Sequence, residues 1–274
     1  MMLIDSHCHP NSEELRANAA ALMERARAAG VGRMLVVGCD LENSREAVAM
    51  AHRFASYGAY AAVGVHPHEA RHYEAGLPEE LINLASDSRG LAPRVVALGE
   101  MGLDYHYDHS PRDVQRRVFV MQLEWAARVN MPVILHIREA MPDALAILRD
   151  FAEHIPLLFH CYAGGLEYLG EVLGLGALCA LGGAVTWKGK ASGELRDVAA
   201  RIPIERLLLE TDCPYMTPAP HRGKPNEPAY VSHVYEAVAS LRGLSAEDLA
   251  SQIQSNAGAF FKWGGALHQE APHV

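Results

Sequence analysis

Short apolar runs alternate with longer amphipathic stretches along almost all of the 274 residues. The runs are rich in Val, Leu and Ala and lack strict polar–apolar alternation, as is typical of strands buried on both faces. Eight strand–helix units are the count of a (β/α)8 TIM barrel, whereas a doubly wound sheet, the alternative, rarely has eight parallel strands in one domain. The sequence therefore predicts an α/β barrel. Its expected strands are 2–8, 33–39, 59–65, 94–100, 131–137, 156–162, 177–183 and 206–212.

Helical spacing fills the intervals between these runs. We expect Gly30 to cap the end of the first helix, and either Asn43 or Ser44 to cap the start of the second. Ser245 and Asp248 form a capping box that opens the last helix. The expected helices are 13–29, 43–56, 78–87, 111–129, 139–153, 165–173, 191–201, 229–241 and 245–261.

The length and composition fit one globular domain. Half of the residues are hydrophobic, which is sufficient for a large core, and no Pro/Ser/Gly-rich linker divides the chain. We therefore expect one barrel domain over 1–263 and a disordered tail over 264–274. Five scattered cysteines, no apolar run of transmembrane length and no signal-like N-terminus favour a cytoplasmic protein without a membrane partner.

The net charge of −9 excludes one class of function. Wrapping long duplex DNA depends on many Lys and Arg contacts to phosphates, and an acidic chain is a poor candidate for it. The charge does not exclude an enzyme that holds a phosphate with metal ions in a local pocket. The acidic net charge favours a small substrate, or a longer one that is bound only at its end.

Unusual polar residues fall where the expected strands end. A lone buried histidine is more often a hydrogen-bonded core residue than a ligand, and a lone acid is often a helix cap or an arginine partner. Core packing and helix capping do not readily explain why several histidines and acids occur together at the carboxyl ends of the strands. In a barrel of this kind, the active site lies at these ends. Imidazoles with carboxylates suit a divalent cation. The residues are His7, His9, His66, His68, Glu100, His136, His160 and Asp212.

Spacing adds detail to this prediction. His7 and His9 are two residues apart on a strand, so both side chains point the same way and Cys8 points away. Six of these residues are candidate ligands: His7, His9, Glu100, His136, His160 and Asp212. One tetrahedral ion needs fewer ligands than this, so the number favours a two-metal site. Glu100, on a middle strand, is the best candidate for a bridging carboxylate. Asp212 is expected to ligate one ion and to act as a general base.

The sequence resembles the TatD-type metal-dependent hydrolases, a group within the amidohydrolase-like barrels. The resemblance runs from about residue 3 to about residue 262, and its matching stretches together are highly specific. They are IDSHCH (4–9), VGVHPH (63–68), ALGEMGLDYH (97–106), PRDVQRRVF (111–119), PVILHIREA (132–140), HCYAGG (160–165), LLLETDCPYM (207–216) and HRGKPNEPAYV (221–231).

The resemblance implies a deoxyribonuclease that cleaves phosphodiester bonds near DNA ends with a metal-activated water. It implies two divalent ions, which can be Mg²⁺, Mn²⁺ or Zn²⁺. Single-stranded or end-bound DNA is the expected partner, and no obligate protein partner is expected. His7, His9, Glu100 and Asp212 would hold the first ion. Glu100, His136 and His160 would hold the second ion.

The neighbouring polar residues have two interpretations each. His66 and His68 bind a phosphate or the leaving group, or His68 only caps the segment that follows. Arg138 clamps a phosphate with both guanidinium nitrogens, or forms a surface ion pair with Glu139 or another acid. Asp5 is expected to orient a ligand histidine from behind. Positive charge on the loops of the expected substrate rim comes from Lys188 and Arg222.

Three functions therefore remain open. The first is a phosphodiesterase that acts on DNA. The second is an ester or amide hydrolase with the same metal pair, such as a D-aminoacyl-tRNA deacylase or a small-molecule amidohydrolase. The third is a non-catalytic barrel, which the complete set of candidate ligands disfavours.

Overall fold

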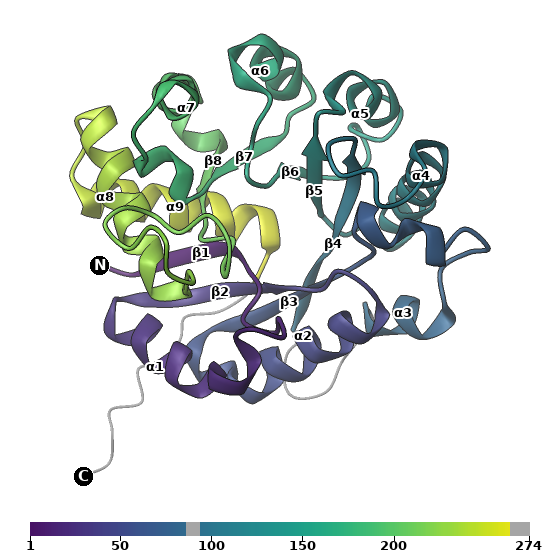
Figure 1. The fold of residues 1–274 in the computed structure, drawn as a ribbon, viewed down its shortest axis with the longest axis horizontal. Helices are drawn as coiled ribbons and strands as arrows, with labels where there is room; N and C mark the ends of the chain where they lie inside the picture. Colours follow the sequence, from purple (N-terminus) through teal and green to yellow (C-terminus); the bar gives the residue numbers. More distant parts are fainter. Residues whose placement is uncertain (86–93, 264–274) are drawn as a thin grey trace.

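The computed structural model describes residues 1–85 and 94–263. Eight parallel strands, hydrogen-bonded in the order β1 to β8, curve into a nearly closed barrel with helices around the outside (Figure 1). The predicted fold class is confirmed, and the expected tail, 264–274, lies outside the described residues. The strands are β1 Leu3–Cys8, β2 Val31–Val37, β3 Ala59–Val63, β4 Val95–Asp104, β5 Val133–Arg138, β6 Leu157–Phe159, β7 Leu178–Leu181 and β8 Leu207–Leu209.

The helices follow the predicted pattern with shifted ends. The second helix begins earlier than expected, because the Asp40 side chain accepts a hydrogen bond from the Asn43 amide at 2.7 Å and caps it; the prediction of Asn43 or Ser44 was wrong. The Ser245 cap is confirmed, since its hydroxyl accepts from the Asp248 amide at 3.0 Å. The helices are α1 Ala19–Ala28, α2 Leu41–Arg53, α3 Glu79–Leu84, α4 Arg112–Val129, α5 Met141–Leu148, α6 Gly165–Gly174, α7 Lys190–Arg201, α8 Val231–Arg242 and α9 Ala246–Phe261.

Strand β4 is longer and less regular than its sequence suggests. Its pairing with β5 shifts register between Leu98 and Met101, and Glu100 lies within this irregularity. Such a shift turns a side chain out of strict alternation. Farther along, a Cβ on Gly102 would lie 2.1 Å from the backbone oxygen of His136, so only glycine permits this close approach of β4 to β5.

The seam between β8 and β1 is closed by residues that follow the short last strand. The Asp212 amide donates to the His7 carbonyl oxygen at 2.9 Å, and the His9 amide donates to the Cys213 carbonyl oxygen at 2.8 Å. The same hydrogen bonds that close the barrel therefore bring Asp212 beside the two histidines of β1.

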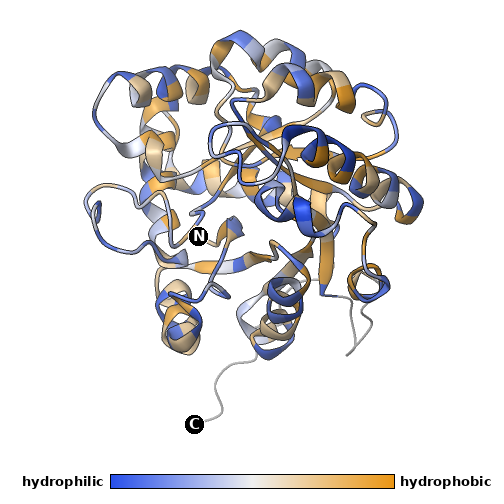
Figure 2. Cartoon of the chain, turned by 45° about the vertical axis from the view of Figure 1, so that its right-hand side comes forward, coloured by the Kyte–Doolittle hydropathy of each residue, from blue (hydrophilic) through white to orange (hydrophobic). Residues whose placement is uncertain are grey.

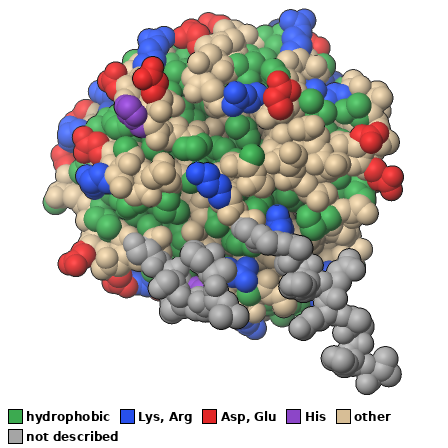
Figure 3. Space-filling view, turned by 180° about the vertical axis from the view of Figure 1, so that it is seen from behind, with side chains coloured by type: hydrophobic (Ala, Val, Ile, Leu, Met, Phe, Trp, Pro, Cys, Tyr) green, Lys and Arg blue, Asp and Glu red, His purple; other side chains and the backbone are tan. Residues whose placement is uncertain are grey.

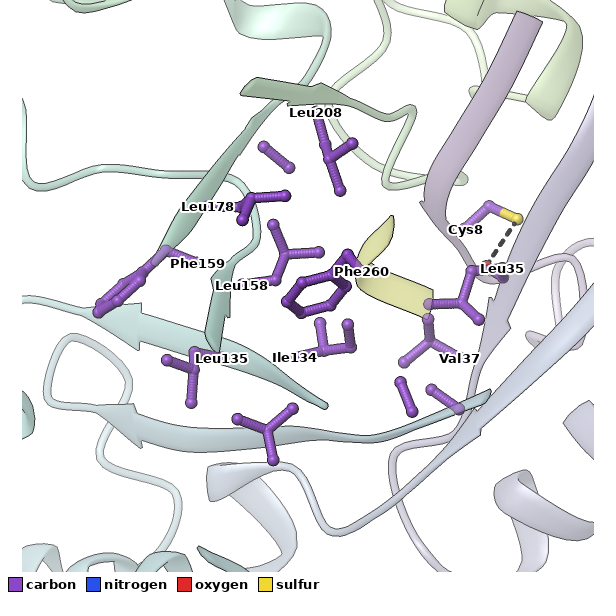
Figure 4. Packing of buried hydrophobic residues seen from close by; sticks show 14 of the residues in the cluster. Cys8, Leu35, Val37, Ile134, Leu135, Leu158, Phe159, Leu178, Leu208 and Phe260 are labelled. Carbon is purple, nitrogen blue, oxygen red and sulfur yellow. Dashed lines mark hydrogen bonds between the residues drawn. The ribbon is translucent and has the colours of Figure 1, made fainter. Parts of the chain in front are cut away.

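The core lies inside the ring of strands and between the strands and the helices. Hydrophobic residues occupy the strands, whereas hydrophilic residues occupy the outward helix faces (Figure 2). Phe260 of α9 lies among side chains of several strands, including Leu35, Ile134 and Leu158 (Figure 4). Within residues 1–85 and 94–263, none of the helices is both long and apolar enough to cross a membrane.

Replacing Gln122 with leucine is expected to destabilise the fold. The buried side-chain amide of Gln122, on α4, accepts from the Val65 amide at 2.8 Å and donates to the Val65 carbonyl at 2.9 Å, just beyond β3. Leucine would leave both backbone groups buried and unpaired, so the free energy of unfolding should fall by about 2–4 kcal/mol. Urea unfolding followed by circular dichroism measures this loss.

Glu124→Leu, at an exposed position of the same helix, is the matched control and should change stability by about 0.5 kcal/mol or less. Equal unfolding midpoints for Gln122→Leu and Glu124→Leu would contradict this account of the α4–β3 contact.

Candidate metal centre

Glu100 lies between two groups of imidazoles at the carboxyl ends of the strands. Its Oε1 lies 3.4 Å from His9 Nε2 and 3.8 Å from His7 Nε2. Its Oε2 lies 3.0 Å from His160 Nε2 and 3.4 Å from His136 Nδ1. The two oxygens of one carboxylate therefore face two different groups of potential ligands.

Asp212 joins the first of these groups. Its Oδ1 lies 3.5 Å from His9 Nε2 and 3.8 Å from His7 Nε2. The backbone of Asp212 has φ 55°, a left-handed conformation that Asp tolerates better than most residues. The Asp212 side chain is 13% exposed against 5% for Glu100, so it keeps more access to solvent.

Three of the imidazoles direct one nitrogen to this centre and the other to an outer oxygen. The outer oxygens belong to Val37 for His9 (carbonyl, 3.1 Å), Asp104 for His136 (Oδ2, 3.2 Å) and Glu210 for His160 (Oε1, 3.5 Å). Histidines that bind metals commonly have such an outer partner, which fixes the ring and its tautomer. The arrangement therefore has the form of a metal centre.

The electrostatics of the cluster favour an ionised Glu100 and a neutral His7, whereas His160 holds a proton beside the carboxylates. Burial alone would raise the pKa of Glu100. The neighbouring imidazoles outweigh burial, with the largest effect from His66, and hold this pKa well below its usual range. Burial, followed by the charge of His160, lowers the pKa of His7. Burial would lower the pKa of His160 as well, but Glu100 and Glu210 outweigh it and raise that pKa to about 10. A bound cation would replace the proton that these carboxylates attract.

The donor set fits a divalent cation. Groups of ligand atoms within 4.8 Å of one another are formed by His7, His9 and Glu100, by His66, Glu100 and His136, and by His7, His160 and Glu210. Nδ1 of His7 is buried and has no hydrogen-bond partner among the described residues. Imidazole and carboxylate ligands together suit borderline and hard divalent ions.

The two remaining histidines take different positions from those expected. His66 Nε2 lies 4.0 Å from Glu100 Oε2, so His66 borders the cluster itself. Nδ1 of His66 accepts from the His68 amide at 3.1 Å, and His66 rather than His68 therefore caps the turn Pro67–His72. Of the two interpretations of His68, the structure contradicts the cap, and phosphate binding stays a prediction. Nε2 of His68 lies 2.9 Å from Asp104 Oδ2, so His68 is linked to the cluster through Asp104, which also contacts His136.

The expected substrate-binding cations come from separate segments: Arg138 ends β5, and Lys188 and Arg222 lie on later loops. The Arg138 guanidinium, at the end of β5, lies 4.7 Å from the centre of the Tyr107 ring, while Glu139 contacts His106 at 2.7 Å. Arg222 lies 4.4 Å from the centre of the Trp187 ring. Lys188 is exposed on the loop after β7. Trp187 also lines a cavity of about 300 Å³, together with Cys161, Gly182, Leu195 and Met216.

The position of Asp5 corrects another expectation. Its carboxylate accepts hydrogen bonds from the Thr211 amide at 2.9 Å and the Thr211 hydroxyl at 2.6 Å, and from the His7 amide at 3.4 Å. These partners differ from the imidazole that was predicted. Because β1 and β8 meet at this seam, the buried Asp5 carboxylate joins the two strands.

Three residues near the centre were not assigned from the sequence. Asp104 contacts His136 and His68, and Glu210 contacts His160. Cys39 Sγ lies 3.4 Å from Glu100 Oε1. Cys39 ends a predicted strand, Asp104 follows one, and Glu210 lies two residues before the end of another, so position was an available signal. Residue type, however, suggested other roles: a turn residue for Asp104, a packing residue for Cys39, and for Glu210 an acid next to the better candidate Asp212.

Glu210→Gln is expected to weaken metal binding. The Glu210 carboxylate accepts from the Cys161 amide at 2.6 Å and faces His160 Nδ1, and glutamine keeps its size but removes its charge. Loss of an outer partner of a ligand histidine typically costs 10–100-fold in metal affinity. Isothermal titration of metal-free protein with Zn²⁺ or Mn²⁺ measures the change. Glu171→Gln, on the exposed face of α6, is the control, and equal affinities for the two variants would rule out this role.

The fold and the cluster define a class: a (β/α)8 barrel with a buried histidine–carboxylate centre at the catalytic end. The family model described as TatD related DNase matches residues 4–262. The metal-dependent hydrolase YabD of Bacillus subtilis, called uncharacterized, is 39% identical, with 95% of this chain and 99% of that protein covered. The 3'-5' ssDNA/RNA exonuclease TatD of Klebsiella pneumoniae is 36% identical, with 94% and 97% covered.

A solved structure gives the same result. The crystal structure of the TatD homolog YJJV from Escherichia coli superposes with a TM-score of 0.86 at 31% sequence identity, covering 96% of this chain and 98% of that one. The chain therefore belongs to the TatD related DNase family and is a metal-dependent hydrolase.

Proposed function

We propose that this protein is an exonuclease that hydrolyses phosphodiester bonds of single-stranded DNA or RNA with two divalent ions. The observation that carries the proposal is the orientation of Glu100, whose Oε1 faces His7 and His9 while its Oε2 faces His136 and His160. A bridging carboxylate holds two ions at the spacing that phosphoryl transfer uses. The relatives named as 3'-5' exonucleases support removal of nucleotides from the 3' end.

The residues divide between two ions. The first ion would be held by His7, His9 and Asp212. The second ion would be held by His136 and His160, and Glu100 would bind both ions. Mg²⁺, Mn²⁺ and Zn²⁺ are the candidates for this donor set. When bound, such ions polarise a phosphoryl oxygen and make a water more acidic.

Asp212 is the residue we assign to proton transfer. Its Oδ1 faces the two histidines of β1, and its greater exposure gives water access to the carboxylate. A carboxylate in this position orients the attacking water and accepts its proton. Glu100, which is more buried and has an imidazole beside each oxygen, is less suited to receive that proton.

The substrate side of the centre is formed by groups beyond the ligands. Arg138 is the last residue of β5, two positions after His136, and its guanidinium can bind a phosphate through two nitrogens. His68, held by Asp104, is available to donate to a phosphate or a leaving oxygen. Lys188 and Arg222 contribute positive charge from the later loops.

Product analysis tests the proposed function. Purified protein with Mg²⁺, Mn²⁺ or Zn²⁺ would receive 5'-labelled single-stranded DNA and RNA, an aminoacyl-tRNA and a simple aryl ester. We expect a ladder of products shortened from the 3' end. Intact oligonucleotides with every metal, together with cleavage of the aminoacyl or aryl ester, would instead establish the alternative hydrolase.

A further inference from the structure

Two tyrosines are far more exposed than the other aromatic side chains that the structure describes. Tyr107 is 51% exposed and Tyr215 is 61% exposed. Among large hydrophobic side chains in the described ranges, only the N-terminal methionine is more exposed. Rings this accessible leave apolar surface in water, which needs a reason when two of them border one site.

Both tyrosines lie at the mouth of the barrel, on opposite sides of the candidate metal centre. Tyr107 follows the last residue of β4, Asp104, by three positions, and Tyr215 follows Asp212 by three positions. Strands β4 and β8 are half a turn apart in the eight-stranded ring. The loops that carry the tyrosines therefore face each other across the carboxyl ends of the strands (Figure 1).

Each ring is in contact with the periphery of the centre. The Tyr215 ring lies 6.5 Å from the His9 ring, edge to face. The Tyr107 ring lies 5.5 Å from the His68 ring, and Arg138 lies 4.7 Å from its centre. On the β4 side, the Tyr107 ring already contacts the Arg138 guanidinium and stacks on the His109 ring, whose centre is 5.6 Å away, so a nucleobase on Tyr107 would take the place of one of them.

The charge of the protein makes such apolar contacts useful. With a net charge of −9, the chain lacks the general electrostatic attraction on which many nucleic-acid proteins depend. On the face seen in Figure 3, Lys and Arg side chains are interspersed with Asp and Glu. Stacking on an aromatic ring is available to every base and does not require a basic surface.

We propose that Tyr107 and Tyr215 stack the nucleobases on the two sides of the scissile phosphate. The site would then take a single strand of at least two nucleotides, with its phosphate over the centre and one base on each tyrosine. Bases within a duplex already stack on one another and cannot present their faces in this way. The inference rests on the proposed function and adds to it two residues that bind nucleobases.

Binding of a nuclease-resistant ligand tests the stacking without requiring cleavage. The full chain, in Mg²⁺, would be titrated against a fluorescent phosphorothioate tetrathymidylate and against the same backbone with abasic residues, with anisotropy as the readout. We expect Tyr215→Ala and Tyr107→Ala each to weaken binding of the tetrathymidylate about tenfold, as loss of one stacked base typically does. Tyr215→Ala should not change binding of the abasic ligand. Tyr107→Ala also removes the ring beside Arg138, so it should weaken binding of the abasic ligand, but by less than it weakens binding of the tetrathymidylate.

Two controls sharpen the result. Tyr215→Phe and Tyr107→Phe keep the ring and should bind as the wild type does. Tyr57→Ala changes a half-buried tyrosine in the turn before β3, at the opposite end of the barrel, and should have no effect.

The inference is overturned if the wild type binds both ligands equally, or if either alanine variant weakens both ligands by the same factor or weakens neither. It is also overturned if the phenylalanine variants lose as much affinity as the alanine variants. The proposed function fails separately. Intact natural oligonucleotides with unchanged base-dependent binding would refute the nuclease but retain the stacking.

Discussion

Glu100→Ala is expected to abolish both metal binding and turnover. Alanine removes the carboxylate whose two oxygens face the two imidazole groups, so neither ion keeps its shared ligand. We expect purified Glu100→Ala to contain close to background metal and to lose roughly 1,000-fold or more in nuclease rate, since the ions supply several kcal/mol of transition-state stabilisation. Elemental analysis and a gel-based nuclease assay measure the two quantities.

Glu236→Ala is the matched control, because this glutamate is 70% exposed on α8. It should retain the metal content and rate of the wild type. A circular dichroism melt of each variant separates loss of metal from loss of fold. Unchanged metal content in folded Glu100→Ala would refute the bridging assignment.

Asp212→Asn is expected to reduce turnover by roughly 100-fold or more while the fold is kept. Asparagine has nearly the same shape and retains the oxygen that faces His9, but it cannot accept a proton from water. Loss of a general base typically costs two to four orders of magnitude in rate. Single-turnover cleavage of a 5'-labelled oligonucleotide at saturating metal gives the rate of the chemical step.

Metal titration of Asp212→Asn distinguishes its two proposed roles. If turnover recovers as metal concentration rises, Asp212 acts mainly as a ligand. A rate near that of the wild type at ordinary metal concentrations would remove it from both roles. Asp197→Asn, an exposed position on α7, controls for the change of net charge.

The strands were predictable because each is a short apolar run that the barrel buries on both faces. Their ends were harder to predict, because hydrogen bonds from distant segments decide them. Strand β4 continues to Asp104 because its last residues pair with β5, whereas β8 ends at Leu209. The cap at Asp40 was missed, since Asn43 and Ser44 are equally good caps when only residue type is considered.

The outer layer of the centre could not be derived from spacing alone. The oxygen beside His160 comes from Glu210, which directly follows β8, and the one beside His136 comes from the far end of β4. Asp5, adjacent in sequence to the first histidines, instead binds Thr211 across the seam. Sequence separation does not predict such contacts, because the closure of the barrel creates them.

By itself, the sequence determined the number and order of the strands and the placement of His7, His9, Glu100, His136, His160 and Asp212 near strand ends. These features follow from local apolar periodicity and from the chain direction, which parallel strands share. Only the tertiary structure decided which oxygen of Glu100 faces which imidazoles and which acids lie behind the histidines. It also decided that Tyr215 lies beside His9 and Tyr107 beside His68. Those relations depend on closing the ring and on the register shift in β4, both of which join residues far apart in the chain.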